Sequence, residues 1–222
     1  MDFFSPAGIL LPAGSGWTIQ NNTPATSNQR SSGIGATGDE AANQLYDGRE
    51  TLVETYKLFA GTGTLPILGT VVDTSLWHID SFSLTLSATD WPVLTIHAHK
   101  HTDGVGHASM KTYTPSITAP TAAWGIPEAP LGITVGTLTT VGVSSVEYNF
   151  SVTHVDELAG DGKQLGAQNR DGVETLSCSY VGTTTPAPPT ADWDAMETGT
   201  PASNTAATGG NAAWEHHVTA DT

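Results

Sequence analysis

The chain has 222 residues, of which 22 are Asp or Glu and only 7 are Lys or Arg, so its formal net charge is −15 at pH 7. This length fits one domain, or one domain with extended arms. The charge excludes nucleic-acid binding by phosphate neutralisation, although an acidic wall lets a duplex slide past without sticking. Only 13% of the residues are charged. Thr, Ser, Ala and Gly take their place, and this composition favours β structure over helix.

Neither a disulfide nor a membrane segment is predicted. Cys178 is the only cysteine, so it cannot form an internal disulfide, and its place in an alternating apolar stretch favours a small buried side chain. The N-terminus lacks a basic region, and its apolar patch at 9–11 is cut by Pro12. No run approaches the roughly 20 apolar residues of a membrane span. We therefore expect the chain to fold in a cytoplasm.

Residues 1–48 show no sustained hydrophobic periodicity and are rich in Gly, Ser, Thr and Asn. A patch at 39–45 is competent to form a short helix, and a turn follows at 46–48. Loops longer than about 15 residues are uncommon inside compact domains. We therefore predict that residues 1–48 form an N-terminal arm or long loop that reaches over a partner.

From residue 49 to residue 182 the pattern changes to short alternating runs separated by turn residues, which predicts an all-β core. We expect a β-sandwich or barrel of short antiparallel strands with long loops, extended N- and C-terminal arms, and one or two short helices. The expected strands cover residues 50–58, 65–72, 79–88, 93–101, 133–143, 146–155 and 173–181.

The clearest alternation occurs at 79–88, where Phe82, Leu84 and Leu86 are separated by small hydroxyl residues. One face of the sheet is therefore predicted to be buried and the other solvated. A long interstrand loop is expected at 157–172. Residues 183–222 read as a Pro- and Thr-rich linker followed by a C-terminal strand or arm, with the strand at 214–218.

A row of histidines is the nearest approach to a chemical motif. Alternation places His97, His99 and His101 on one face of a strand, with neighbouring same-face Cα atoms about 6.5 Å apart, a spacing that zinc can use. From His99 the sequence matches the first five positions of H-x-H-x-D-H through Asp103, but Gly104 replaces the final His. We therefore interpret the row as polar or subunit-facing, with a metal-dependent enzyme or metalloprotein as the alternative.

Other candidate sites are weaker. His154 shares its strand face with Phe150 and Val152, so a hydrogen-bonded core histidine is expected. No G-x-S-x-G elbow occurs, and the acidic residues at 156–171 lack the spacing of an EF-hand calcium loop. Six tryptophans leave a carbohydrate-binding β-sandwich open, although core and interface positions are commoner for Trp. We predict no catalytic residue, no cofactor and no resident metal.

The overall character of four segments resembles that of bacteriophage tail tube proteins. These segments are 77–84 (WHIDSFSL), 92–100 (PVLTIHAHK), 152–156 (VTHVD) and 172–176 (GVETL). The resemblance covers residues 50–182 and consists of a Thr- and Gly-rich β core, an extended interstrand loop, a flexible N-terminal region and a C-terminus able to form a strand. It implies a β-sandwich or barrel whose protomers form stacked rings, commonly hexameric, around a DNA channel. The family has no catalytic residues to transfer.

The function predicted from the sequence is therefore that of a virion structural protein, not an enzyme. A tail tube is the preferred interpretation, with another head, neck or tail component as the alternative. The expected partners are further copies of the chain, other virion proteins, and genomic DNA that passes without specific binding. The expected location is the virion, assembled in the cytoplasm of the bacterial host, without a membrane.

Overall fold

The structure of the protein is a computed structural model. It describes residues 8–34, 40–72, 77–101, 110–127, 130–133, 142–158, 164–181, 186–190, 192–198 and 209–219.

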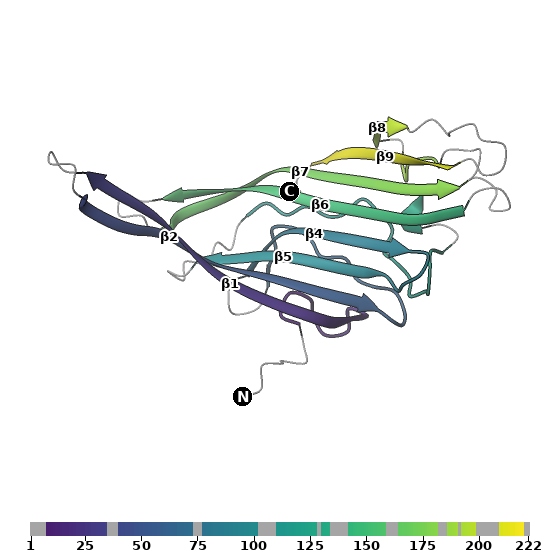
Figure 1. The fold of residues 1–222 in the computed structure, drawn as a ribbon, viewed down its shortest axis with the longest axis horizontal. Helices are drawn as coiled ribbons and strands as arrows, with labels where there is room; N and C mark the ends of the chain where they lie inside the picture. Colours follow the sequence, from purple (N-terminus) through teal and green to yellow (C-terminus); the bar gives the residue numbers. More distant parts are fainter. Residues whose placement is uncertain are drawn as a thin grey trace.

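Within these ranges the chain forms nine strands and one 3₁₀ turn, Pro130–Gly132. The strands are β1 (Trp17–Ile34), β2 (Glu40–Leu58), β3 (Val71–Val72), β4 (Trp77–Ser87), β5 (Val93–His101), β6 (Gly142–Leu158), β7 (Gln164–Val181), β8 (Asp194–Thr198) and β9 (Gly209–Val218). All belong to one antiparallel sheet in the order β1-β2-β5-β4-β6-β7-β9-β8, with β3 paired to β4 (Figure 1). The predicted all-β class is confirmed.

One face of this sheet is apolar, as the alternation at 79–88 predicts. Phe82, Leu84 and Leu86 are buried, whereas Ser83 is half-buried and Thr85 is exposed between them. The second layer of the sandwich-like body consists largely of loop segments packed against this face. Their buried side chains in the common core are Leu10, Leu11, Leu68, Tyr113, Ile117, Leu131, Ile133 and Trp193.

A buried carboxylate holds the first of these loops. Glu54 lies on the core face of β2 and is fully buried. The backbone N–H groups of Ile9 and Leu10 donate to it at 3.0 and 2.9 Å, the Asn22 amide donates at 3.0 Å, and the Tyr56 hydroxyl donates as well. Burial above all, and then this hydrogen bond, raise the pKa of Tyr56 far above its usual value. Because backbone N–H groups must be satisfied when buried, Glu54 decides where residues 8–11 dock.

A second buried carboxylate plays the same part on β7. Glu174 is fully buried, and its Oε1 accepts hydrogen bonds from the Ser116 backbone N–H and the Tyr148 hydroxyl, both at 2.6 Å. Nearby, Tyr113 packs directly over Gly172, where an added Cβ would lie 2.5 Å from the Tyr113 ring. The loop containing Tyr113 and Ser116 is thus fixed on the sheet by one carboxylate and one close aromatic contact.

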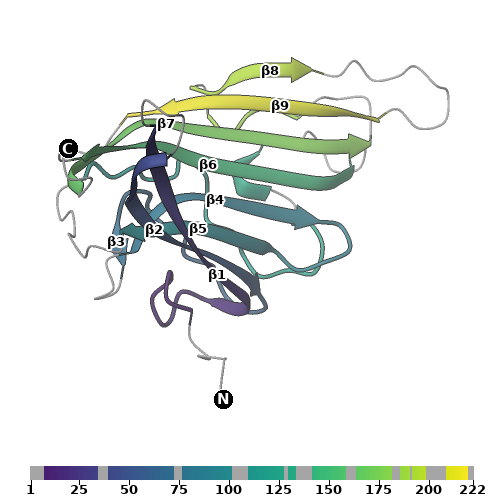
Figure 2. The ribbon, with the colours of Figure 1, turned by 60° about the vertical axis from the view of Figure 1, so that its left-hand side comes forward.

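Two hairpins extend beyond the rest of the sheet. Strand β2 pairs with β5 from Arg49 onward, so residues 40–46 pair only with β1 in the described structure. Strand β6 pairs with β4 as far as Ser151, and β7 pairs with β9 from Gly172, so residues 153–158 and 164–170 pair only with each other there. Both extensions project toward the same end of the molecule (Figures 1 and 2).

The N-terminal part departs from the sequence-based expectation. A helix-competent patch was expected at 39–45, but residues 40–45 are strand, and residues 17–34 are strand where an arm or loop was expected. The expected boundary between residues 48 and 49 therefore falls inside β2. The physical reason is that apolar alternation reveals only half-buried strands, and these residues, rich in Gly, Ser, Thr and Asn, lack it.

Several other boundaries also differ. Residues 164–172 belong to β7 and are not loop, and of the strand expected at 65–72 only Val71–Val72 is strand. The strand expected at 133–143 falls mostly outside the described residues. The strand at 93–101 is confirmed, the C-terminal strand at 214–218 is confirmed within the longer β9, and β8 was not expected.

Candidate functional site

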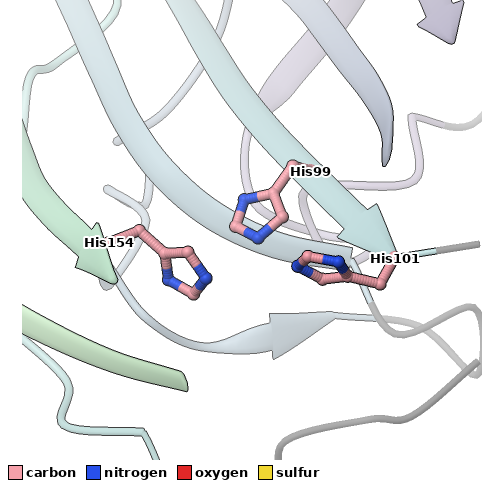
Figure 3. A group of neighbouring side chains, drawn as sticks. All are labelled: His99, His101 and His154. Atoms are coloured by element: carbon pink, nitrogen blue, oxygen red, sulfur yellow. The ribbon is translucent and has the colours of Figure 1, made fainter. Parts of the chain in front are cut away.

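Three histidines from two strands meet at the base of the β6/β7 extension. His99 and His101 lie at the C-terminal end of β5, and His154 lies on β6 just after Ser151, where β6 stops pairing with β4. Because β6 leaves β4 at this point, its continuation comes to lie against the end of β5. Figure 3 shows the three side chains projecting toward one another.

The cluster is tight and almost completely buried. One ring nitrogen of each histidine lies within 4.8 Å of one ring nitrogen of the other two. The centroids of the His99 and His154 rings are 4.4 Å apart, and those of His99 and His101 are 5.4 Å apart. The exposed fractions of the three side chains are only 4%, 3% and 8% for His99, His101 and His154. His78, the Cα partner of His99 on β4, stacks on its ring at 5.4 Å.

Polar neighbours orient two of the rings. His99 Nδ1 lies 2.7 and 2.8 Å from the two carboxylate oxygens of Asp80, so this nitrogen carries the proton and donates it. The Asn169 amide nitrogen donates to the Lys111 carbonyl oxygen at 3.1 Å, which turns its Oδ1 toward His154 Nδ1 at 3.0 Å. His154 Nδ1 therefore also carries a proton, so Nε2 is the nitrogen that the neutral form of each ring would leave unprotonated.

A carboxylate completes the cluster. Asp156, whose side chain is 5% exposed, has its Oδ1 at 2.8 Å from His154 Nε2 and 3.3 Å from His101 Nε2. Its other oxygen accepts a hydrogen bond from the Arg49 guanidinium on β2. Burial is the largest influence on the His154 ring and lowers its pKa, so the neutral form is favoured.

The set of groups is chemically specific. Three imidazole nitrogens and one carboxylate oxygen are donors that suit zinc and other divalent first-row metals. The same groups without an ion form a buried polar network in which several nitrogens face one carboxylate. The two states differ in whether a metal ion or only protons lie between the ring nitrogens and the carboxylate oxygen.

The sequence-based interpretation of the histidine row is only partly right. His97 is exposed, as expected for a polar row, but His99 and His101 are buried. Asp103 lies outside the described residues. His154 is hydrogen-bonded and mostly buried, as expected, but it joins the cluster instead of standing alone in the core. No sequence spacing links residue 101 to residue 154, so only the divergence of β6 from β4 reveals this partner.

Two further surface features are present. An open depression lies over β4, β6, β7 and β9, and small residues such as Ser145, Ser177 and Asn211 line it. Cys178 borders the depression but is buried, and burial raises the pKa of its thiol to about 11, so the thiol stays protonated near neutral pH. On another part of the surface, Trp91 packs edge-on against both Phe59 and Trp124.

No helix in the part of the chain that the structure describes is long and apolar enough to cross a membrane. Comparison of the sequence with protein-family models and with curated proteins finds no match in either set.

Proposed function

We propose that this chain is a structural subunit of a bacteriophage virion that assembles by β-strand pairing, and that its assembly is a tail tube of stacked rings around a DNA channel. Rings of six protomers are the preferred form. The observation that supports self-assembly best is the pair of two-stranded extensions, β1/β2 and β6/β7, that project beyond the sheet.

Such extensions call for a partner. A two-stranded hairpin is only marginally stable in water, and three or more strands with a buried face are needed for independent stability. Residues 21–27 of β1, which lead into this extension along the outer edge of the sheet, are all exposed. Pairing with another copy supplies the missing strand and covers the exposed backbone.

The outer edges of the sheet are suited to such pairing. Strands β1 and β8 each have a partner on one side only among the residues described. Lysine commonly guards exposed edges against pairing, but neither β1 nor β8 contains a lysine. Other edge-protecting features are present, namely Pro24 and Arg30 in β1 and the shortness of β8, so strand addition would use the stretch of β1 between Pro24 and Arg30.

The aromatic group of Phe59, Trp91 and Trp124 offers a second contact surface. Trp124 is 63% exposed and Phe59 is 44% exposed. Tryptophan is enriched among the residues that contribute most to protein interfaces, and we assign this group to contact with a neighbouring subunit or another virion protein. A sugar ligand stacked on Trp124 is the competing occupant, and glycan-array binding distinguishes the two.

The negative net charge suits a channel through which DNA passes better than a site that binds nucleic acid. A ring of chains that each carry a formal charge of −15 repels the phosphate backbone from its wall, so DNA passes without being held. In this proposal the partners are further copies, other virion proteins and transiting DNA. The role is structural and not catalytic, and the location is the virion.

The proposal is tested by sedimentation velocity and negative-stain electron microscopy over a wide concentration range. We expect rings or tubes that grow with concentration. Replacing Ala25 on the exposed part of β1 by Lys should weaken assembly, because a charged side chain then guards the edge. Ala13→Lys makes the same chemical change at an exposed turn and should assemble normally.

Three outcomes decide between the alternatives. Tubes support the tail tube, whereas discrete rings that never stack favour another head, neck or tail component. A folded monomer at every concentration contradicts assembly by strand pairing.

A further inference from the structure

The histidine cluster has the organisation of a metal site even though no part of the proposed assembly requires one. Each of three groups that face the centre is held from behind by a different residue. Asp80 holds His99, Asn169 holds His154, and Arg49 holds Asp156. In metal sites such outer contacts fix the tautomer of a histidine and direct its free nitrogen at the ion.

His99 supplies the first independent sign. Its Nε2 is buried and has no hydrogen-bond partner among the residues that the structure describes, while its Nδ1 donates to Asp80. A buried polar atom without a partner costs free energy and is rare in native structures. A cation at the centre of the cluster gives this nitrogen its partner.

The contact between His154 and Asp156 is the second sign. His154 Nε2 lies 2.8 Å from Asp156 Oδ1, and His101 Nε2 lies 3.3 Å from the same oxygen. Two imidazole nitrogens thus converge on one buried carboxylate oxygen, and histidine nitrogens and carboxylate oxygens are the ligand types that zinc takes together.

We propose that His99, His101 and His154 bind one divalent first-row transition-metal ion through their Nε2 atoms, with Asp156 Oδ1 as the fourth ligand. Zinc suits this donor set because it takes nitrogen and carboxylate ligands in tetrahedral geometry. Tetrahedral zinc with Zn–N bonds of about 2.0–2.1 Å needs nitrogens roughly 3.4 Å apart. The present separations, up to 4.8 Å, require the side chains to move inward by small torsional changes.

The site is structural and not catalytic. A catalytic zinc keeps an open coordination position for water or substrate, whereas the side chains here are at most 8% exposed and four protein ligands complete the shell. The ion would join β5 to β6, which are separated by β4 in the sheet. It would thus fix the base of the β6/β7 extension relative to the end of β5.

This inference does not rest on the proposed assembly, because binding is measured on the isolated chain. The protein is produced without a polyhistidine tag, stripped with a chelator and dialysed against zinc, and bound metal is measured by mass spectrometry. Calorimetric titration with ZnCl₂ gives the affinity and the number of ions bound. The cobalt-substituted protein reports geometry, because tetrahedral Co²⁺ absorbs more strongly in the visible range than octahedral Co²⁺.

The matched variants are His99→Gln, His154→Gln and the control His97→Gln, which alters an exposed histidine on the same strand as His99. We expect one zinc per chain in the natural protein and in His97→Gln, and loss of binding in the other two. Zinc should raise the melting temperature of the natural protein but not of His154→Gln.

A milder change covers the case in which a ligand variant fails to fold. Asp80→Asn leaves all four ligands in place but removes the carboxylate behind His99, and we expect zinc affinity to fall by about 10- to 100-fold. Absence of stoichiometric zinc in the natural protein overturns the proposal. So does unchanged binding in both His99→Gln and His154→Gln, which would place the ion at other histidines.

Discussion

Glu54 allows a sharp test of how the loop layer is attached to the sheet. Its carboxylate accepts four hydrogen bonds, two of them from the backbone of residues 9 and 10. Glu54→Gln keeps the size and shape of the side chain but replaces one acceptor oxygen by an amide that donates. One of the two oxygen positions therefore loses its ability to accept.

The expected loss of stability depends on which hydrogen-bond donors to Glu54 can reorient and accept a hydrogen bond instead. If the amide takes the Oε2 position, the Tyr56 hydroxyl can rotate and accept from it, but the Leu10 N–H, 2.9 Å from Oε2, cannot. One buried N–H then lacks a partner at a cost of about 1–3 kcal/mol, and the remaining bonds weaken by roughly another 1 kcal/mol because their acceptor is neutral. We expect a total loss of about 2–4 kcal/mol.

Glu50→Gln is the matched control. It makes the same chemical change on the same strand, but the Glu50 side chain is 38% exposed and pairs with Lys100 at 2.8 Å. Exposed ion pairs contribute about 0–1 kcal/mol. Both variants remove one formal negative charge, so any effect of net charge cancels in the comparison.

Urea denaturation followed by tryptophan fluorescence measures the global free energy of unfolding. Because two of the four hydrogen bonds to Glu54 come from the backbone of this segment, the loss can also appear as local release of residues 8–11. Hydrogen exchange at Leu10 then accelerates by roughly 30- to 1,000-fold for a loss of this size. Equal effects of Glu54→Gln and Glu50→Gln in both measurements would refute the anchoring role of Glu54.

Three further predictions concern single side chains. Gly172→Ala should cost about 1–3 kcal/mol, because its Cβ would lie 2.5 Å from the aromatic ring packed over it, whereas Gly142→Ala, with open space around it, should be neutral; urea denaturation of both variants checks this. Burial raises the pKa of Cys178 to about 11, so Ellman's reagent at mildly alkaline pH should react slowly with the native protein and rapidly in urea, and fast native reaction would contradict the burial. The hydrogen bond from Lys57 holds the pKa of Asp90 below its usual value, so the stabilisation by this pair is present above the unfolded-state pKa and is lost as the pH falls through the folded-state pKa. A carbon NMR titration of Asp90 should show a higher midpoint in Lys57→Ala, and an unchanged midpoint would count against the pair.

The histidine cluster shows where prediction from sequence fails. The strand at 93–101 could be predicted from the sequence, because apolar and polar side chains alternate every two residues in a half-buried strand. The burial of His99 and His101 could not be predicted from the sequence, because the residues that enclose them come from β2, β4 and β6. The same limit applies to Glu54. It occupies a core position in β2, where an apolar residue is expected, and only the hydrogen-bond donors that surround its carboxylate explain its burial.

By itself the sequence determined the all-β class, the solvated face of the sheet and the acidic character, because these follow from composition and local periodicity. The tertiary structure alone decided that the N-terminal residues pair as a hairpin, that loops form the second layer, and that His154 reaches the end of β5. Each of these depends on contacts between residues far apart in the chain, and local periodicity contains no information about which distant residues meet.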